Sequence, residues 1–296
     1  MYQQIADNKR RTWLLLIGFV IFLTLIAYLI AQVFGYGYDF VFNIGLFSVI
    51  WSLVSYYVGP SIVLATAGAR RINKEDNPYV YNLVENLCIA SGQPLPKIYI
   101  SPEKAMNAFA TGRDPKHASI CLTSGIIENL ENEELEGVIA HELSHIKNYD
   151  IKVMTLAGVL VGIIVMISDI FVRSLLWGGR NRDKEERGSP ILMVIGLVLV
   201  VLSPIIAQII QLAISRRREF LADASGVLLT RYPLGLANAL RKISQNTAEL
   251  RRVSQATAHL YIANPFKKQG FLVRLFSTHP AVADRIKALK GMEKSN

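Results

Sequence analysis

The sequence predicts a multi-pass α-helical membrane protein in which an α+β domain lies on the cytoplasmic side. Three observations lead to this fold class: four long apolar segments, Lys and Arg residues concentrated at one end of them, and an H-E-x-x-H pattern in the polar remainder. Hydrophobic residues make up 51% of the chain, barely above the content of a soluble domain. Their clustering therefore carries the prediction rather than their total.

The first two apolar segments form an N-terminal membrane part, residues 1–69. Residues 13–32 are an uncharged apolar stretch of the length that crosses a hydrocarbon core, since about 20 residues at 1.5 Å each span roughly 30 Å. A cleaved signal peptide would have a shorter apolar core, so we expect a retained transmembrane helix. A second transmembrane helix is expected at about 40–64, in an uncharged run that Pro60 interrupts.

Two further apolar segments make up residues 153–214. The segment at 153–177 carries Asp169 and Arg173, whereas the segment at 190–214 has no charged residue. The charged pair is spaced i, i+4 and is either mutually neutralised on one helix face or functional. Both segments cross the membrane, or they form a hairpin that does not cross fully; in either case the chain returns to the side from which it left.

The distribution of Lys and Arg predicts the orientation, because positive loops mark the cytoplasmic side. We therefore expect the polar parts 70–152 and 215–296, and both termini, in the cytoplasm beneath the cell's inner or plasma membrane. The loop 178–188 is an exception, since it carries four basic residues and should lie outside. The residues that set the orientation are Lys9, Arg10, Arg11, Arg70, Arg71, Lys74, Arg216, Arg217 and Arg218.

The net charge of +9 fits a lipid bilayer as partner, since anionic headgroups attract the same charge that nucleic acid does. No stretch interleaves basic and aromatic residues, so we expect no nucleic-acid partner. Cys88 and Cys121 are the only cysteines, which excludes a disulfide framework and a thiolate metal cluster.

The polar parts alternate between helix and strand patterns, as an α+β domain does. The residues at 77–91 have helical spacing behind a well-placed Pro78, and 95–101 alternates like a strand. Residues 105–125 read as two strands around a turn. Asn132 is the expected N-cap of the helix that carries the H-E-x-x-H pattern. Further helices are expected at 217–229, 233–245 and 282–290.

His141 and His145 are four residues apart, so on a helix both imidazoles project from one face. That spacing lets two histidine nitrogens reach one zinc ion, while Glu142 is placed to take a proton from a water bound there. A glutamate from a later helix is one standard third ligand, and Glu219 in "RRREFLADASG" offers it. Asp223, one turn beyond, would accept the other N–H of a ligand histidine.

The pattern alone also fits a helix whose histidines face solvent or headgroups. No other histidine follows at the spacing of the extended H-E-x-x-H-x-x-G-x-x-H pattern, and we expect neither His117 nor His259 to bind metal. Asp150 is either an acid that supports a ligand or the last polar residue before a membrane segment.

"HELSHIKNYD", "EFLADASG" after two apolar spans, and "STHPAVADRI" together resemble the HtpX family of bacterial membrane zinc metalloproteases, relatives of the CAAX prenyl endopeptidases. The resemblance covers nearly the whole chain. It implies a gluzincin-like, zincin-type metallopeptidase domain and an endopeptidase that cuts misfolded or damaged membrane proteins in stress-related quality control. By matching position, His141, His145 and Glu219 bind one Zn²⁺ per chain and Glu142 is catalytic.

Further positions follow from the same resemblance. Asn107, Ala108 and Phe109 match an edge strand to which substrate backbone would add, or form an ordinary edge strand. His279 and Arg285 match a late motif whose histidine would stabilise an oxyanion. The competing interpretation of His279 is a His-Pro turn at the start of the last helix.

Two alternatives remain beside the endopeptidase. One is a CAAX-type prenyl-protein endopeptidase, although such relatives have more spans. The other belongs to a different class, a membrane transporter or channel that uses Asp169 and Arg173, in which the H-E-x-x-H helix would be idle. The expected macromolecular partners are therefore membrane-protein or polypeptide substrates.

Overall fold

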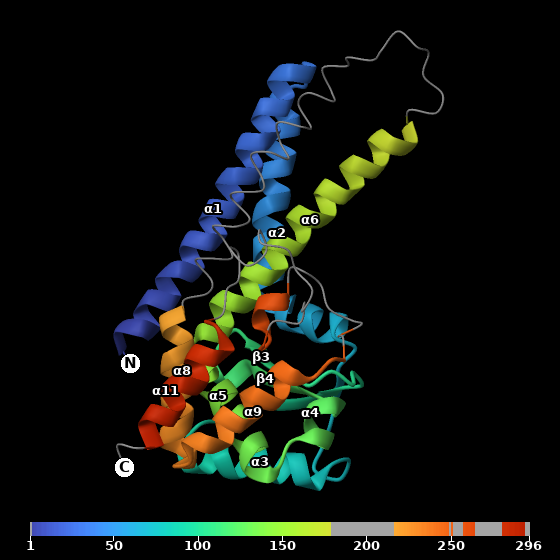
Figure 1. Cartoon of the computed structure of the whole chain (residues 1–296). Helices are drawn as coiled ribbons and strands as arrows, with labels where there is room; N and C mark the ends of the chain where they lie inside the picture. Colours follow the sequence, from blue (N-terminus) through green and yellow to red (C-terminus); the bar gives the residue numbers. More distant parts are fainter. Residues whose placement is uncertain (1, 179–215, 249, 251–256, 264–279, 294–296) are drawn as a thin grey trace.

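The computed structural model describes most of the chain (Figure 1). The fourth apolar segment, at 190–214, and His279 lie outside the described residues, as do the side chains of Asp169 and Arg173. The described residues are 2–178, 216–248, 250, 257–263 and 280–293.

Three long helices extend to one side of a folded domain (Figure 1). Helix α1 (Tyr2–Phe34) packs against α2 (Tyr38–Thr66), and both contact α6 (Asp150–Gly178). Among the described residues, two helices are long and apolar enough to cross a membrane, Ile5–Gln32 within α1 and the whole of α2. They contain the segments expected at about 13–32 and 40–64. A third span is reached only if residues 150–166 of α6 are combined with the preceding helix, Asn132–Lys147. The axes of these two helices differ by 85°.

The folded domain contains a four-stranded mixed sheet with the order β1-β2-β4-β3. Strands β2 (Lys97–Ser101) and β4 (Ala118–Thr123) are parallel, and β3 (Ala108–Gly112) runs antiparallel to β4. The short β1 (Arg70–Arg71) pairs with β2. Every residue of β3 and β4 is buried, which explains why their sequences lack the polar alternation of a solvated strand. Strand β3 therefore ends the sheet at a covered edge.

Helix α5 (Asn132–Lys147) lies at the centre of the domain. It packs against β3, against α3 (Pro78–Ser91), and against α8 (Arg216–Thr230) and α9 (Pro233–Gln245). Helix α11 (Val282–Glu293) covers α9 and α8. The shared core includes Ile98, Ile120, Leu135, Ile139, Leu143 and Leu240. Shorter elements are α4 (Ser124–Asn129), η1 (Pro115–His117) and η3 (Ala258–Leu260).

The helix starts follow from capping chemistry. Asn77 caps α3, since its side chain accepts a hydrogen bond from the backbone N–H of Val80 at 3.1 Å. The expectation that Asn132 caps α5 is wrong by one residue. Glu131 is the cap, because Glu134 lies three residues later and its carboxylate accepts the Glu131 backbone N–H at 2.9 Å.

Candidate metal centre

The two histidines of the H-E-x-x-H pattern lie on one face of α5 and point into the domain. Both are almost completely buried, so neither faces solvent or headgroups. The Nε2 atoms of His141 and His145 are 3.2 Å apart. Their rings are perpendicular, with centroids 4.7 Å apart, as helical i, i+4 spacing allows.

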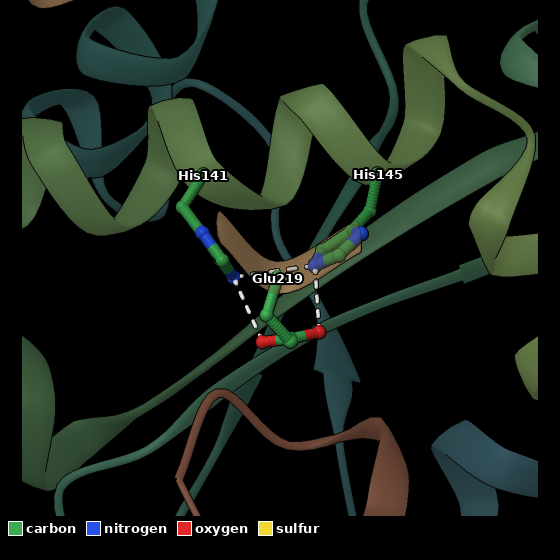
Figure 2. A group of neighbouring side chains, drawn as sticks. All are labelled: His141, His145 and Glu219. Carbon is green, nitrogen blue, oxygen red and sulfur yellow. Dashed lines mark hydrogen bonds and ion pairs between the residues drawn. The ribbon is translucent and has the colours of Figure 1, made fainter. Parts of the chain in front are cut away.

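Helix α8 brings Glu219 to these histidines (Figure 2). Its carboxylate faces both rings: Oε1 lies 3.5 Å from His145 Nε2, and Oε2 lies 3.8 Å from His141 Nε2. Gly226 permits this approach, because a Cβ atom there would lie 3.1 Å from the backbone nitrogen of His141. One candidate ligand atom from each of the three side chains lies within 4.8 Å of the others.

The three side chains fit a divalent zinc ion. Two imidazole nitrogens and a carboxylate oxygen are ligands that zinc accepts in catalytic sites. Two ligands held at about 2.0–2.1 Å in tetrahedral geometry are roughly 3.3 Å from each other. The separations of 3.2 Å between the two Nε2 atoms and 3.5 Å between His145 and Glu219 lie near that value, whereas the 3.8 Å between His141 and Glu219 is longer.

Each histidine is oriented by a carboxylate behind it. His141 Nδ1 lies 2.9 Å from Asp223, and His145 Nδ1 lies 3.0 Å from Asp150. A proton on each Nδ1 would satisfy these contacts and leave both Nε2 lone pairs directed at the space beside Glu219. The structure thus places Asp150 against His145, a candidate ligand, and at the first position of α6.

The electrostatics of the centre favour a cation. Burial and the charge of Arg285 lower the pKa of His141 to about 4. Burial also opposes a charge on His145, but its hydrogen bond to Asp150 and the nearby Glu219 carboxylate outweigh this and raise its pKa to about 9. The carboxylates that raise the pKa of His145 would also attract a metal ion, which would take the place of the second imidazole proton.

Arg285 is fully buried at the back of the centre. It donates two hydrogen bonds to Asp223, at 2.6 Å and 2.8 Å, and its Nη1 lies 3.5 Å from Glu219. Although burial disfavours a charged carboxylate, Arg285 keeps the pKa of Asp223 below its usual range. Its guanidinium also donates to the carbonyl of Ile262 at 3.0 Å. Arg285 therefore holds Asp223, which in turn holds His141.

Glu142 lies on α5 beside the two histidines and is buried. Burial raises the pKa of its carboxyl to about 7, although the charge of nearby His145 opposes this. The backbone of Ala110 in β3 hydrogen-bonds to the carboxylate. A pKa near 7 suits a group that accepts and returns a proton at neutral pH.

The outer edge of β3 is already paired with the chain's own residues. Ile262 donates its backbone N–H to the carbonyl of Ala108 at 2.9 Å. The side-chain amide of Asn107 pairs with the backbone of Ala263, donating at 3.0 Å and accepting at 3.4 Å. The ring of Phe109 packs edge-on against Tyr261, with centroids 5.0 Å apart.

The other histidines of the described residues lie away from the centre. His117 bonds to Asp114 on the surface, and His259 Nε2 lies 2.9 Å from the carbonyl of Met154. Among the described residues, Arg218 and Asn8 contact Asp150, but the sequence does not single them out. Arg218 looks like part of a basic flank, and no local pattern marks Asn8.

A buried His-His-Glu set on two helices, beside a glutamate and a mixed sheet, defines a metalloprotease. The chain belongs to Peptidase family M48, whose model matches residues 74–293. It is 44% identical to the Protease HtpX homolog of Thermoanaerobacter pseudethanolicus over 99% of this chain and 98% of that protein. The Protease HtpX homolog of Tropheryma whipplei (strain Twist) is 46% identical, with the same coverage.

The fold is also similar to that of a solved protein. The crystal structure of S. mikatae Ste24p superposes with a TM-score of 0.53 at 22% identity. The match covers 89% of this chain and 62% of that one. These comparisons confirm the expected family, a relative of HtpX proteases, and the expected fold class of apolar helices followed by a metallopeptidase domain.

Proposed function

We propose that this membrane metalloprotease is a zinc endopeptidase that cleaves misfolded or damaged membrane proteins at the cytoplasmic face. One observation carries the proposal. His141, His145 and Glu219 converge within 4.8 Å, and the buried Glu142 lies on the same helix as the two histidines. The two imidazole nitrogens are 3.2 Å apart, close to the separation of two tetrahedral ligands, and the donor set is one that zinc accepts.

In this proposal His141, His145 and Glu219 hold the ion, and Asp223 and Asp150 fix the two imidazoles. Zinc, when bound, supplies a Lewis acid that makes a water molecule acidic near neutral pH. Glu142 would act as general base and then as general acid: its carboxylate would take a proton from the water that attacks the peptide carbonyl and would give it to the nitrogen that leaves as the C–N bond breaks.

The substrate backbone would add to β3 as a further strand, which is how extended peptides bind exposed sheet edges. The groups that would receive it, the Asn107 amide and the Ala108 carbonyl, hold Ile262 and Ala263 in this structure. We therefore propose that an extended substrate replaces these two residues at the edge. Phe109 and Tyr261 then border its path.

The membrane arrangement is proposed from charge and position. The basic flanks of α1, α2 and α8 favour a cytoplasmic domain. We propose that α6 and the apolar residues 190–214 form two further membrane segments, which divide the metallopeptidase domain into 70–152 and 215–296. The domain lies directly beside the ends of the long helices, where segments of a damaged membrane protein would emerge (Figure 1).

The test measures zinc content and cleavage separately, in the full chain purified in detergent. Glu142→Gln keeps the shape of a buried side chain but removes its basicity, so we expect about one zinc per chain and no cleavage. Glu219→Ala should lose most of the zinc and all cleavage. Glu133 is an exposed glutamate on the same helix, so Glu133→Gln is the matched control and should keep both zinc and cleavage.

The substrates for this test are an unfolded membrane protein and a prenylated peptide. Cleavage of the prenylated peptide alone would favour a CAAX-type enzyme. Full zinc occupancy and normal cleavage in Glu219→Ala would remove the proposed third ligand.

A further inference from the structure

Asn8 of α1 is a buried polar residue at the point where this helix passes the junction of α5 and α6. Its side chain is 2% exposed. The amide nitrogen donates to the carbonyl of Asn148 at 2.9 Å and to Asp150 Oδ1 at 2.8 Å. The amide oxygen accepts from Arg218 at 3.1 Å. Both amide protons and the amide oxygen are used, so this side chain has one orientation.

The junction that Asn8 contacts is tightly bent. Helix α5 ends at Lys147, α6 begins at Asp150, and the axes turn by 85° between them. Tyr149 makes the turn with a φ of 61°, a left-handed conformation that costs free energy for a non-glycine residue. Such a conformation persists only where neighbours enforce it. Lys9 supplies a second contact from α1, with its Nζ 5.3 Å from the centre of the Tyr149 ring.

Asp150 joins this junction to the metal centre, because its two carboxylate oxygens have different partners. Oδ2 lies 3.0 Å from His145 Nδ1, whereas Oδ1 is held by Asn8 and, at 3.2 Å, by Arg218. With Oδ1 fixed, the carboxylate is not free to rotate away from the imidazole. Asn8 and His145 are far apart in sequence and share one intermediary.

The geometry points to Asn8 as a positioning residue for the metal centre: the N-terminal membrane helix completes the site by fixing Asp150, and Asp150 fixes His145. The inference rests on the proposed zinc site and adds a function for α1 besides anchoring. Partners one step removed from a metal ligand commonly change metal affinity by 10–100-fold when they are lost. Asn8 acts through Asp150, so its loss should fall at the lower end of that range.

The experiment measures zinc affinity by competition with a chromophoric chelator, using the full chain in detergent. We expect Asn8→Ala to weaken zinc binding about tenfold, and Asp150→Asn to weaken it by that much or more. Combining the two should cost no more than Asp150→Asn alone, because both act through one contact. The absorption spectrum of the cobalt-substituted protein should change in Asn8→Ala as well, since His145 is no longer held.

The controls separate positioning from folding. Asn43→Ala removes the same group from an exposed position on α2 and should leave zinc affinity unchanged. Asn8→Ser keeps one hydroxyl donor, so its zinc affinity should lie between those of the wild type and Asn8→Ala. It replaces Asn8→Ala in the experiment if the alanine variant does not fold.

If Asn8→Ala or its replacement binds zinc with wild-type affinity, the inference is wrong. A fully additive loss in the double variant would also contradict the inference. Either result would leave the proposed function intact. A wild-type chain that binds no zinc would overturn both the inference and the proposed function.

Discussion

Arg285 shows how single residues sustain the metal centre. Its side chain is inaccessible to solvent, and its charge is met by the carboxylates of Asp223 and Glu219 and by the carbonyl of Ile262. The sequence places Arg285 in a late motif but does not reveal its partner, because Asp223 lies 62 positions earlier in the chain. His141 and His145, in contrast, were recognisable because helical spacing alone brings them together. Local geometry is encoded locally, whereas pairing across the chain depends on the fold.

Replacing Arg285 with Ala should destabilise the protein strongly. The substitution leaves Asp223 buried without its cation, and breaking such a pair commonly costs about 3–5 kcal/mol. For a domain of this size we expect the apparent Tm to fall by about 10 °C. Lys287→Ala, at an exposed position on the same helix, should change Tm little. Differential scanning fluorimetry measures both, and equal Tm values would contradict the assigned role of Arg285.

At the scale of elements, α5 is held where α8 and α9 approach it closely. Gly137 allows α9 to touch it, because a Cβ atom there would lie 2.7 Å from the backbone nitrogen of Leu236. Lys242 of α9 adds an ion pair to Glu134 at 2.7 Å. The range expected for α9 from the sequence, 233–245, agrees with the structure at both ends. Pro233 fixes its start, and its apolar residues keep helical spacing. Strand β1 was missed, because two residues are too short to show alternation.

Gly137→Ala should therefore loosen the contact between α5 and α9. The added methyl group meets backbone rather than a flexible side chain, so we expect a loss of about 1–3 kcal/mol in stability. Gly291→Ala in α11 is the matched control, because nothing lies within 4 Å of its Cβ position. That change should be neutral or stabilise by up to about 1 kcal/mol. Denaturant unfolding followed by fluorescence distinguishes the two; a control that is equally destabilised would argue against close packing as the cause.

At the scale of the whole molecule, apolar helices and the metallopeptidase domain share one continuous structure. Leu15 and Phe19 of α1 pack with Val153 and Leu160 of α6, directly beyond the junction that Asn8 contacts. The apolar segments were evident from composition, because a bilayer demands long uncharged runs. The hydrogen bonds between α1 and the junction of α5 and α6 are not evident, since they come from Asn8, which resembles any other polar residue near a helix start.

The proposed orientation can be tested by cysteine labelling of spheroplasts or protoplasts that express single-cysteine additions. Cys88 and Cys121 are buried, and burial raises the pKa of the Cys88 thiol to about 11, so the natural thiols should stay unlabelled. Gly37→Cys, between α1 and α2, should react with a membrane-impermeant maleimide from outside. Glu75→Cys, in the domain, should react only after the membrane is permeabilised. The reverse pattern would place the domain outside the cell.

The division of the candidate ligands between α5 and α8 has a consequence for the protein's own biosynthesis. A ribosome adds about 5–20 residues per second, so Glu219 is made roughly 4–15 s after His145, and Arg285 later still. Until then the nascent chain holds two of the three proposed ligands. If these side chains bind zinc as proposed, the centre is incomplete while residues 153–214 are being made, and we expect no cleavage by the nascent chain until Glu219 has followed them.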